Sequence, residues 1–173
     1  MVGMGVMRLG GICYESLTNG EGLRTVLFSQ GCRHNCKGCF NPDTHDFNGG
    51  EEFTVQEINE TIERVSPLID GVTFSGGDPF EQAKDFAEIA KFCHSLGLNI
   101  WCYTGYTYEH LIEYSDSNNR WSDLLTNIDV LIDGKFIQEL YDGTLKFKGS
   151  SNQRIIDVKL SNACGKVILY SHK

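Results

Sequence analysis

The sequence predicts a single α/β domain with parallel β-strands. Short apolar, β-branched segments alternate along the chain with segments of helical periodicity, an order typical of parallel strands joined by right-handed crossovers. The chain has 173 residues, of which 40% are hydrophobic, enough for one substantial core and too few for two ordinary domains. We therefore expect residues 1–173 to form one domain whose strand-to-helix loops share one sheet edge, where ligands bind in such folds.

The first predicted strand leads directly into a cysteine-rich loop. Residues 25–29 (T-V-L-F-S) are β-branched and aromatic, as in a buried strand, and the segment ends at Gly31. Further along, Thr54 and Glu57 form a capping-box pattern, and apolar residues then recur at helical spacing up to Pro67. These patterns predict a strand, a loop and an amphipathic helix, in that order.

A second strand and helix follow, joined by two glycines. Residues 71–75 (G-V-T-F-S) have strand composition, and Gly76 and Gly77 after them predict a tight turn. Asp78 suits a helix N-cap with a proline at the first helical position, and the predicted helix stops near Gly97. The two glycines thus lie where the carboxyl end of a parallel strand meets a helix.

The rest of the chain continues the alternation less regularly. Residues 99–103 predict a third strand, Thr107 begins a short helix, and residues 130–133 predict a fourth strand. Residues 154–160 and 166–170 have strand character, but their pairing does not follow from the sequence.

Charge and hydropathy limit the kinds of partner. Asp and Glu outnumber Lys and Arg by 23 to 15, giving a net charge of −8, which repels a phosphate backbone. The sequence has no basic stripe, no apolar run of membrane-spanning length and no signal-like leader. It therefore favours a cytoplasmic protein that binds a small ligand or a protein partner, and disfavours nucleic acid and membrane.

Three cysteines within eight residues give the strongest chemical signal. Cys32, Cys36 and Cys39 have the spacing C-x3-C-x2-C in C-R-H-N-C-K-G-C. Ferredoxin-type clusters and structural zinc sites usually have four protein ligands, so three thiolates leave one position open. His34 or a distant cysteine could instead complete a zinc site. The other cysteines are expected to be buried hydrophobes or spare thiols: Cys13, Cys93, Cys102 and Cys164.

The cysteine loop and several further motifs carry a family resemblance. C-R-H-N-C-K-G-C-F, with Phe40 after the last cysteine, resembles the signature of radical S-adenosylmethionine (SAM) enzymes. S-G-G-D-P at residues 75–79 is similar to the glycine-rich strand end that meets the amino group of SAM in that superfamily. Four other strings resemble, in order and spacing, the activating proteins of anaerobic (class III) ribonucleotide reductases: N-G-E-G-L-R (19–24), W-C-Y-T-G-Y (101–106), V-L-I-D-G-K-F (130–136) and K-G-S-S-N-Q-R (148–154).

This resemblance implies a fold, a site and a reaction. The fold would be a partial (β/α) barrel of parallel strands of the radical SAM type, shorter than the usual six units and open on one side. One 4Fe-4S cluster would be held by Cys32, Cys36 and Cys39. SAM would contact eight residues: Gly38, Cys39, Phe40, Gly76, Gly77, Asp78, Asp133 and Lys135.

The resemblance also implies the chemistry and the partners. The cluster, reduced by a flavodoxin-like or other low-potential electron donor, would cleave SAM to methionine and a 5′-deoxyadenosyl radical, with no side chain as general base. That radical would remove a hydrogen atom from a backbone glycine of anaerobic ribonucleoside-triphosphate reductase. The open side of a partial barrel suits such a macromolecular substrate.

Several simpler interpretations stay open. Asp78 suits a helix N-cap as well as a ligand contact, and Asp133 with Lys135 suits a strand-end salt bridge. Arg24 suits a contact to the SAM carboxylate or a surface charge. Two other functions also fit the sequence: activation of another glycyl radical enzyme such as pyruvate formate-lyase, and a non-catalytic iron–sulfur carrier or zinc-binding module.

Overall fold

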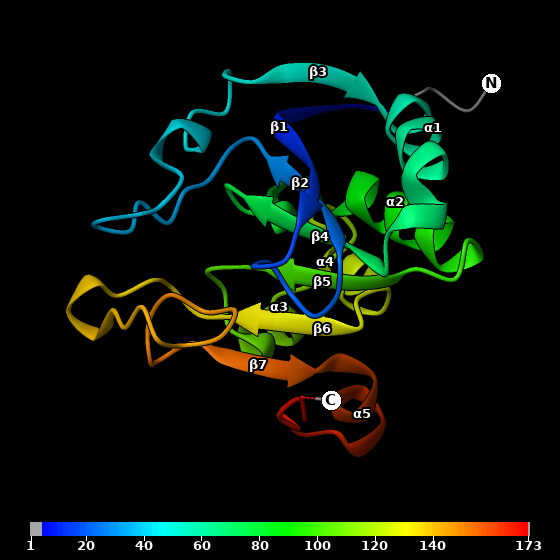
Figure 1. Cartoon of the computed structure of the whole chain (residues 1–173). Helices are drawn as coiled ribbons and strands as arrows, with labels where there is room; N and C mark the ends of the chain where they lie inside the picture. The colour runs from blue at the N-terminus through cyan, green and yellow to red at the C-terminus, as the bar shows by residue number, and fades with distance from the viewer. Residues whose placement is uncertain (1–4, 173) are drawn as a thin grey trace.

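A mixed β-sheet of seven strands organises the protein, whose computed structural model describes residues 5–172 (Figure 1). The strands lie in the order β3-β1-β2-β4-β5-β6-β7. Their bounds are β1 (Val6–Ser16), β2 (Arg24–Ser29), β3 (Glu51–Thr54), β4 (Gly71–Gly76), β5 (Asn99–Tyr103), β6 (Val130–Asp133) and β7 (Arg154–Asp157).

The central strands are parallel, as the sequence predicts. β2, β4, β5 and β6 pair in parallel with one another, whereas β1 is antiparallel to β2 and β3, and β7 is antiparallel to β6. The antiparallel edges are an addition to the expected parallel barrel. Residues 17–23 between β1 and β2 are a short loop, which can join antiparallel strands, whereas a parallel return needs a longer crossover. The fold is therefore α/β with a parallel centre.

Residues 5–172 also form five α-helices and four short 3-10 turns, which lie between the strands except for the last helix, which follows β7. The helices are α1 (Val55–Val65), α2 (Ala83–Ser95), α3 (Tyr108–Glu113), α4 (Trp121–Leu125) and α5 (Val158–Cys164), and the turns are η1 (Pro42–Thr44), η2 (Ser66–Leu68), η3 (Pro79–Gln82) and η4 (Gln138–Leu140). The longest helix, α2, has 13 residues, and no helix in the described part of the chain is long and apolar enough to cross a membrane.

Two helix starts show how local sequence sets the fold. α1 begins with the predicted capping box: Thr54 accepts a hydrogen bond from the Glu57 backbone N–H, and Glu57 accepts one from that of Thr54. The helix predicted after Asp78 opens as the 3-10 turn η3, in which Asp78 accepts from the Phe80 N–H at 3.0 Å, and α-helix follows from Ala83.

Helices cover one face of the sheet and build the larger core. Alternate strand residues point to this face, and Leu27, Phe74, Ile100 and Leu131 are fully buried there. Phe86 of α2 packs on Phe74 with ring centroids 4.7 Å apart. The opposite face carries a smaller core of Trp101, Val130, Ile132 and Ile155. Helices thus close one face, and loops cover the other.

The loops that follow β2 and β6 extend from the same edge of the sheet (Figure 1). This is the edge formed by the carboxyl ends of the parallel strands. The cysteines lie on the first of these loops, and residues 134–153 form the second. The parallel centre of the sheet therefore brings segments about a hundred residues apart to one place.

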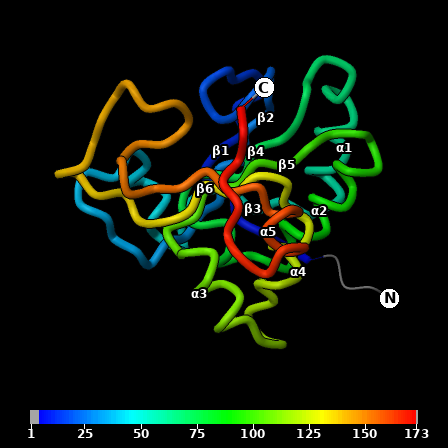
Figure 2. Tube along the Cα trace, turned by 90° about the horizontal axis from the view of Figure 1, so that it is seen from below, coloured from blue at the N-terminus to red at the C-terminus, as the bar shows by residue number. Residues whose placement is uncertain are grey.

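The C-terminal segment departs from its predicted strand character. β7 ends at Asp157, because the Asp157 carboxylate accepts a hydrogen bond from the Leu160 N–H at 2.9 Å and caps α5. Residues 166–170 contribute one bridge to β7, between Leu169 and Ile156. Figure 2 shows this red segment ending beside the blue loop before β2, where the Tyr170 hydroxyl donates to Glu21 at 2.8 Å.

Candidate functional site

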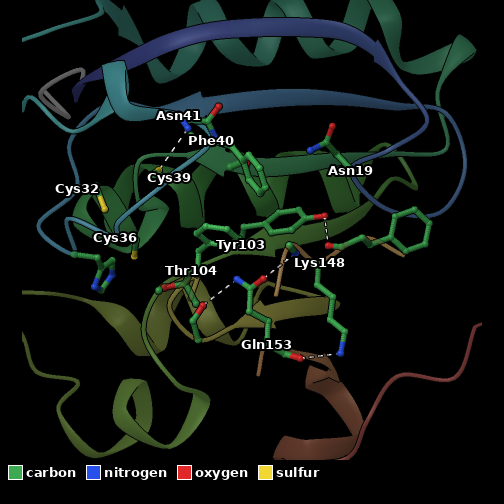
Figure 3. A pocket seen from close by; sticks show the side chains of 18 of the residues that line it. Asn19, Cys32, Cys36, Cys39, Phe40, Asn41, Tyr103, Thr104, Lys148 and Gln153 are labelled. Carbon is green, nitrogen blue, oxygen red and sulfur yellow. Dashed lines mark hydrogen bonds between the residues drawn. The ribbon is translucent and has the colours of Figure 1, made fainter. Parts of the chain in front are cut away.

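A cavity of about 510 Å³ opens at the carboxyl edge of the parallel strands. Its volume lies in the range of about 300–1,000 Å³ common for small-molecule and cofactor sites. Figure 3 shows Cys32, Cys36 and Cys39 at one end of the cavity and Asn19 towards the other, with Tyr103 between them. The cavity is therefore elongated, with sulfur atoms at one end.

Backbone hydrogen bonds hold the cysteine loop in place. The Gly31 N–H donates to the Thr44 carbonyl at 2.8 Å, and the Cys32 N–H donates to the His45 carbonyl at 3.2 Å. The loop then reverses direction through left-handed backbone at Asn35 (φ 51°) and Gly38 (φ 74°). This curvature lets three side chains of one short segment line the same cavity.

Burial disfavours the thiolate forms while the thiols are free. It raises the pKa of Cys32 to about 11, although the His34 backbone N–H opposes this shift; the charge of Asp78 and the neighbouring cysteines raise the pKa further. Burial also raises the pKa of Cys36, although the Phe136 N–H donates to its sulfur and opposes this shift. A metal must therefore displace the thiol protons as it binds.

The donor set fits a cluster with an open iron position. His34, which could have completed a zinc site, turns its Nε2 to Asp78 at 2.7 Å. Within residues 5–172 no three His, Cys, Asp or Glu side chains gather closely enough to hold one metal ion, but a four-iron cluster takes each thiolate on a different iron. The other cysteines do not line the cavity: Cys93 and Cys102 are buried in the core, Cys13 is half-buried and Cys164 is exposed.

The glycines at the end of β4 bring two backbones together. A Cβ on Gly76 would lie 2.6 Å from the Ser29 carbonyl oxygen, and one on Gly77 would lie 2.5 Å from that of Gly31. Gly76 also has a left-handed backbone, with φ 93°. The Gly77 N–H donates to the Ser29 carbonyl at 2.7 Å. Only glycine lets the end of β4 lie directly against the start of the cysteine loop.

The eight predicted cofactor contacts divide into two groups. The cavity lining includes Cys39, Phe40, Gly76 and Gly77, whereas Gly38, Asp78, Asp133 and Lys135 lie outside it.

The residues outside the cavity lining either contact other protein groups or are exposed to solvent. Asp133 is 1% exposed and accepts hydrogen bonds from the Arg154 guanidinium and from the Tyr108 N–H at 2.8 Å. Gly38 packs against the Gln138 side chain, and Lys135 is exposed. Asp133 forms its salt bridge with Arg154, not with Lys135.

Arg24 fits neither of its two sequence interpretations. Its side chain is fully buried, and it donates to the Thr73 hydroxyl at 2.7 Å and the Val72 carbonyl at 2.9 Å. These contacts lie at the amino ends of the parallel strands, opposite the cysteine loop. Arg24 is therefore a structural residue of the sheet.

Several lining residues are not among the predicted site residues, although they belong to motifs that the sequence singled out. Tyr103 projects into the cavity and donates its hydroxyl to the Phe147 carbonyl at 2.6 Å (Figure 3). Lys148 also lines the cavity and donates to the Gln153 carbonyl at 3.0 Å. The Gln153 amide donates to the Gly134 carbonyl at 3.0 Å, so it joins the two ends of the loop after β6.

Fold and site first define a class of protein. Residues 18–156, which include the three cysteines and all the parallel strands, match the family described as "4Fe-4S single cluster domain". The fold is similar to that in the crystal structure of QueE from Escherichia coli, with a TM-score of 0.50 and 13% identity, covering 59% of this chain and 53% of that one. Three thiols beside a glycine-rich strand end in such a sheet, together with the 4Fe-4S family match, agree with the radical SAM class that the cysteine motif resembles.

The curated relatives narrow the class to one family. The chain is 39% identical over 150 residues to the anaerobic ribonucleoside-triphosphate reductase-activating protein of Vibrio cholerae, covering 80% of this chain and 90% of that protein. The protein of the same name from Haemophilus influenzae is 39% identical over 151 residues (82% and 92%), and that from Escherichia coli is 36% identical over 150 residues (79% and 90%). The chain belongs to the family of anaerobic ribonucleoside-triphosphate reductase-activating proteins.

Proposed function

We propose that this protein installs a glycyl radical on an anaerobic ribonucleoside-triphosphate reductase. The observation that carries the proposal is one cavity lined both by three thiols of a single loop and by the glycine-rich end of β4. Family membership supports the choice of reaction and of partner. When bound, the reduced cluster and SAM together supply the radical that takes a hydrogen atom from a glycine of the reductase.

Cys32, Cys36 and Cys39 would hold the cluster, each on a different iron, and leave one iron for SAM. The close approach of β4 to the cysteine loop supports this assignment, because the backbone at Gly76 and Gly77 would then lie beside the cluster, where it could hold the amino group of SAM. The chain's contribution is placement and exclusion of water rather than proton transfer.

The rest of the cavity would hold the other parts of SAM. Phe40 and Tyr103 offer aromatic surfaces in the lining, and such surfaces stack on flat heterocycles such as adenine. Lys148 is a cation in the same lining, suited to a carboxylate. Asp78 and Asp133, fully engaged with protein groups, would act by holding loops rather than by touching SAM.

The mouth of the cavity favours a polypeptide substrate. Phe40 is 64% exposed at the rim, and its ring packs against Phe136, with centroids 4.9 Å apart. Tyr141 is also exposed and lies 6.0 Å from Phe40 by ring centroids. Exposed aromatic side chains are typical of protein-binding surfaces. This rim would receive the glycine-bearing segment of the reductase.

The reaction also needs an electron, which a flavodoxin-like or other low-potential donor would deliver to the cluster. Free thiols and an oxygen-sensitive cluster require a reducing compartment, so we propose the cytoplasm as the location.

Anaerobic reconstitution with iron and sulfide, followed by reductant, SAM and the reductase, tests the function. The expected result is a glycyl radical signal in electron paramagnetic resonance (EPR) spectra that is lost in Cys32→Ser, Cys36→Ser and Cys39→Ser. Cys164→Ser, at an exposed cysteine outside the site, should retain it. A radical formed only on a pyruvate formate-lyase-type enzyme would support the other activase, and iron without 5′-deoxyadenosine formation would support a non-catalytic carrier.

A further inference from the structure

Asp78 is a buried carboxylate that joins three segments around the cysteine loop. It is 0% exposed and lies 2.7 Å from Nε2 of His34, in the middle of that loop. It also accepts hydrogen bonds from the Thr104 hydroxyl at 2.9 Å and the Gly105 N–H at 3.0 Å, both after β5. Together with its bond from the Phe80 N–H, these contacts satisfy both carboxylate oxygens.

A second carboxylate on the same turn holds the preceding residue of the cysteine loop. Glu81 accepts two hydrogen bonds from the Arg33 guanidinium, at 2.9 and 2.6 Å. The Glu81 side chain is only 6% exposed, and its Oε1 also accepts from the Tyr106 hydroxyl at 2.8 Å. A two-pronged guanidinium–carboxylate pair fixes orientation as well as distance.

The ring of His34 is also enclosed by the loop after β5. Tyr106 packs against it edge-on, with centroids 4.4 Å apart. A Cβ on Gly105 would lie 2.5 Å from Cδ2 of His34, so the glycine makes room for the ring. With its side chain 6% exposed, His34 has little freedom to move.

We propose that Asp78 and Glu81, through His34 and Arg33, form a carboxylate clamp that sets the position of the iron ligands relative to SAM. His34 and Arg33 lie between Cys32 and Cys36, and Asp78 directly follows the two glycines at the end of β4. The turn at residues 78–81 therefore contacts the loop that carries the iron ligands and also directly follows the glycines proposed to contact SAM. The inference rests on the proposed function, in which the cysteines hold the cluster and the two glycines contact SAM.

A positioning role follows from how sensitive such chemistry is to geometry. A displacement of about 1 Å of reacting groups can cost about a hundredfold in rate, and residues that orient metal ligands typically contribute about 10–100-fold in metal affinity or activity. Loss of the clamp should therefore alter cofactor binding even where the sheet itself remains folded.

The chain contains a matched control for the His34–Asp78 pair. His94 lies 2.8 Å from Asp129 through the same atoms, Nε2 and Oδ2, but at the opposite edge of the sheet, beside the start of β5. His34→Leu and His94→Leu each remove one histidine–aspartate contact. His94 and Asp129 are more exposed than His34 and Asp78, so circular dichroism must first show that both variants are folded; an effect limited to folded His34→Leu then points to the cysteine loop.

The first measurement uses the reconstituted protein. We expect His34→Leu to weaken SAM binding by about tenfold or more and to change the EPR signal of the reduced cluster with SAM bound. His34→Gln, which retains an N–H donor, should recover most of the affinity, and His94→Leu should match the wild type. Unchanged SAM affinity and an unchanged signal in His34→Leu would overturn the proposal.

The second measurement needs neither cluster nor SAM. Alkylation of Cys32 by iodoacetamide in the metal-free protein, followed by mass spectrometry, should be several-fold faster in His34→Leu and in Arg33→Met. Lys91→Met, which removes the exposed ion pair with Glu88 on α2, should leave it unchanged. Because Arg33 is 67% exposed, its variant should fold even if the His34 variant does not.

The two measurements separate this inference from the proposed function. Wild-type protein that cleaves no SAM would contradict the function and leave the alkylation test intact. Wild-type Cys32 alkylation rates in both clamp variants would contradict the clamp, whatever the wild-type protein does with SAM.

Discussion

Replacement of Arg24 tests the structural role of the N-G-E-G-L-R motif. The Arg24 guanidinium is fully buried at the amino ends of β2, β4 and β5 and lies over the Trp101 ring at 5.5 Å from its centroid. It donates to the Thr73 hydroxyl and to three carbonyl oxygens: those of Glu21 (2.9 Å), Val72 (2.9 Å) and Asn99 (3.2 Å). Arg24→Met keeps the aliphatic length and removes every donor.

The expected loss of stability follows from those contacts. A buried acceptor left without its donor costs about 1–3 kcal/mol, and several acceptors lose theirs here. Removal of a buried charge offsets part of this loss, since burial lowers the pKa of Arg24 to about 10. We expect a net destabilisation of about 2–4 kcal/mol, or about 5–15 °C in Tm for a chain of this size.

Thermal unfolding followed by circular dichroism measures this loss in the metal-free protein. Arg64→Met is the control, because Arg64 lies exposed near the end of α1 and donates to the Thr61 hydroxyl at 3.3 Å. This variant should shift stability by less than about 0.5 kcal/mol. A Tm for Arg24→Met equal to that of Arg64→Met would refute the role assigned to the buried guanidinium.

Three further outcomes follow from the structure. Gly76→Ala should lower SAM affinity, measured by titration, about tenfold or more. Gly165→Ala should not, because Gly165 has a similar left-handed backbone (φ 67°) but, apart from its chain neighbours, no atom of residues 5–172 lies within 4 Å of its Cβ position. Burial opposes a low pKa for Asp129, but bonds from Lys159, His94 and the Ile100 N–H lower it overall. Its contribution to stability should therefore be full above about pH 4 and disappear as the pH falls through the lowered pKa, so the wild-type advantage over Asp129→Asn in urea unfolding should shrink from pH 6 to pH 3. Chelation of iron should leave the far-ultraviolet circular dichroism unchanged, because apolar packing in residues 5–172 builds the sheet; a large loss of signal would contradict this.

The sequence predicted correctly those helices, strands and loops that are determined by residues close together in the chain. Residues 54 and 57 revealed the start of α1 because both halves of a capping box lie within one turn of chain. Residues 71–78 revealed a strand, two glycines and a cap for the same reason. The cysteine loop followed from its spacing, since a ligand set within eight residues needs no knowledge of the fold.

Contacts between residues far apart in the sequence could not be predicted from local patterns. Asp78 was correctly read as a cap, but its bonds to His34 and Thr104 span 44 and 26 residues. The antiparallel pairing of β7 with β6 depends on how residues 134–153 return, which no local pattern specifies. Arg24 illustrates the same limit. Its charge suggested a contact to SAM or a position on the surface, whereas the buried guanidinium donates to carbonyl oxygens of three separate segments.

In the proposed site, three thiolates leave one iron of the cluster open to SAM. Mössbauer spectra of protein reconstituted with enriched iron, recorded with and without SAM, test it directly. We expect SAM to change the signal of one iron and to leave the others as they were. A spectrum unaltered by saturating SAM, in protein with a full four-iron cluster, would contradict it.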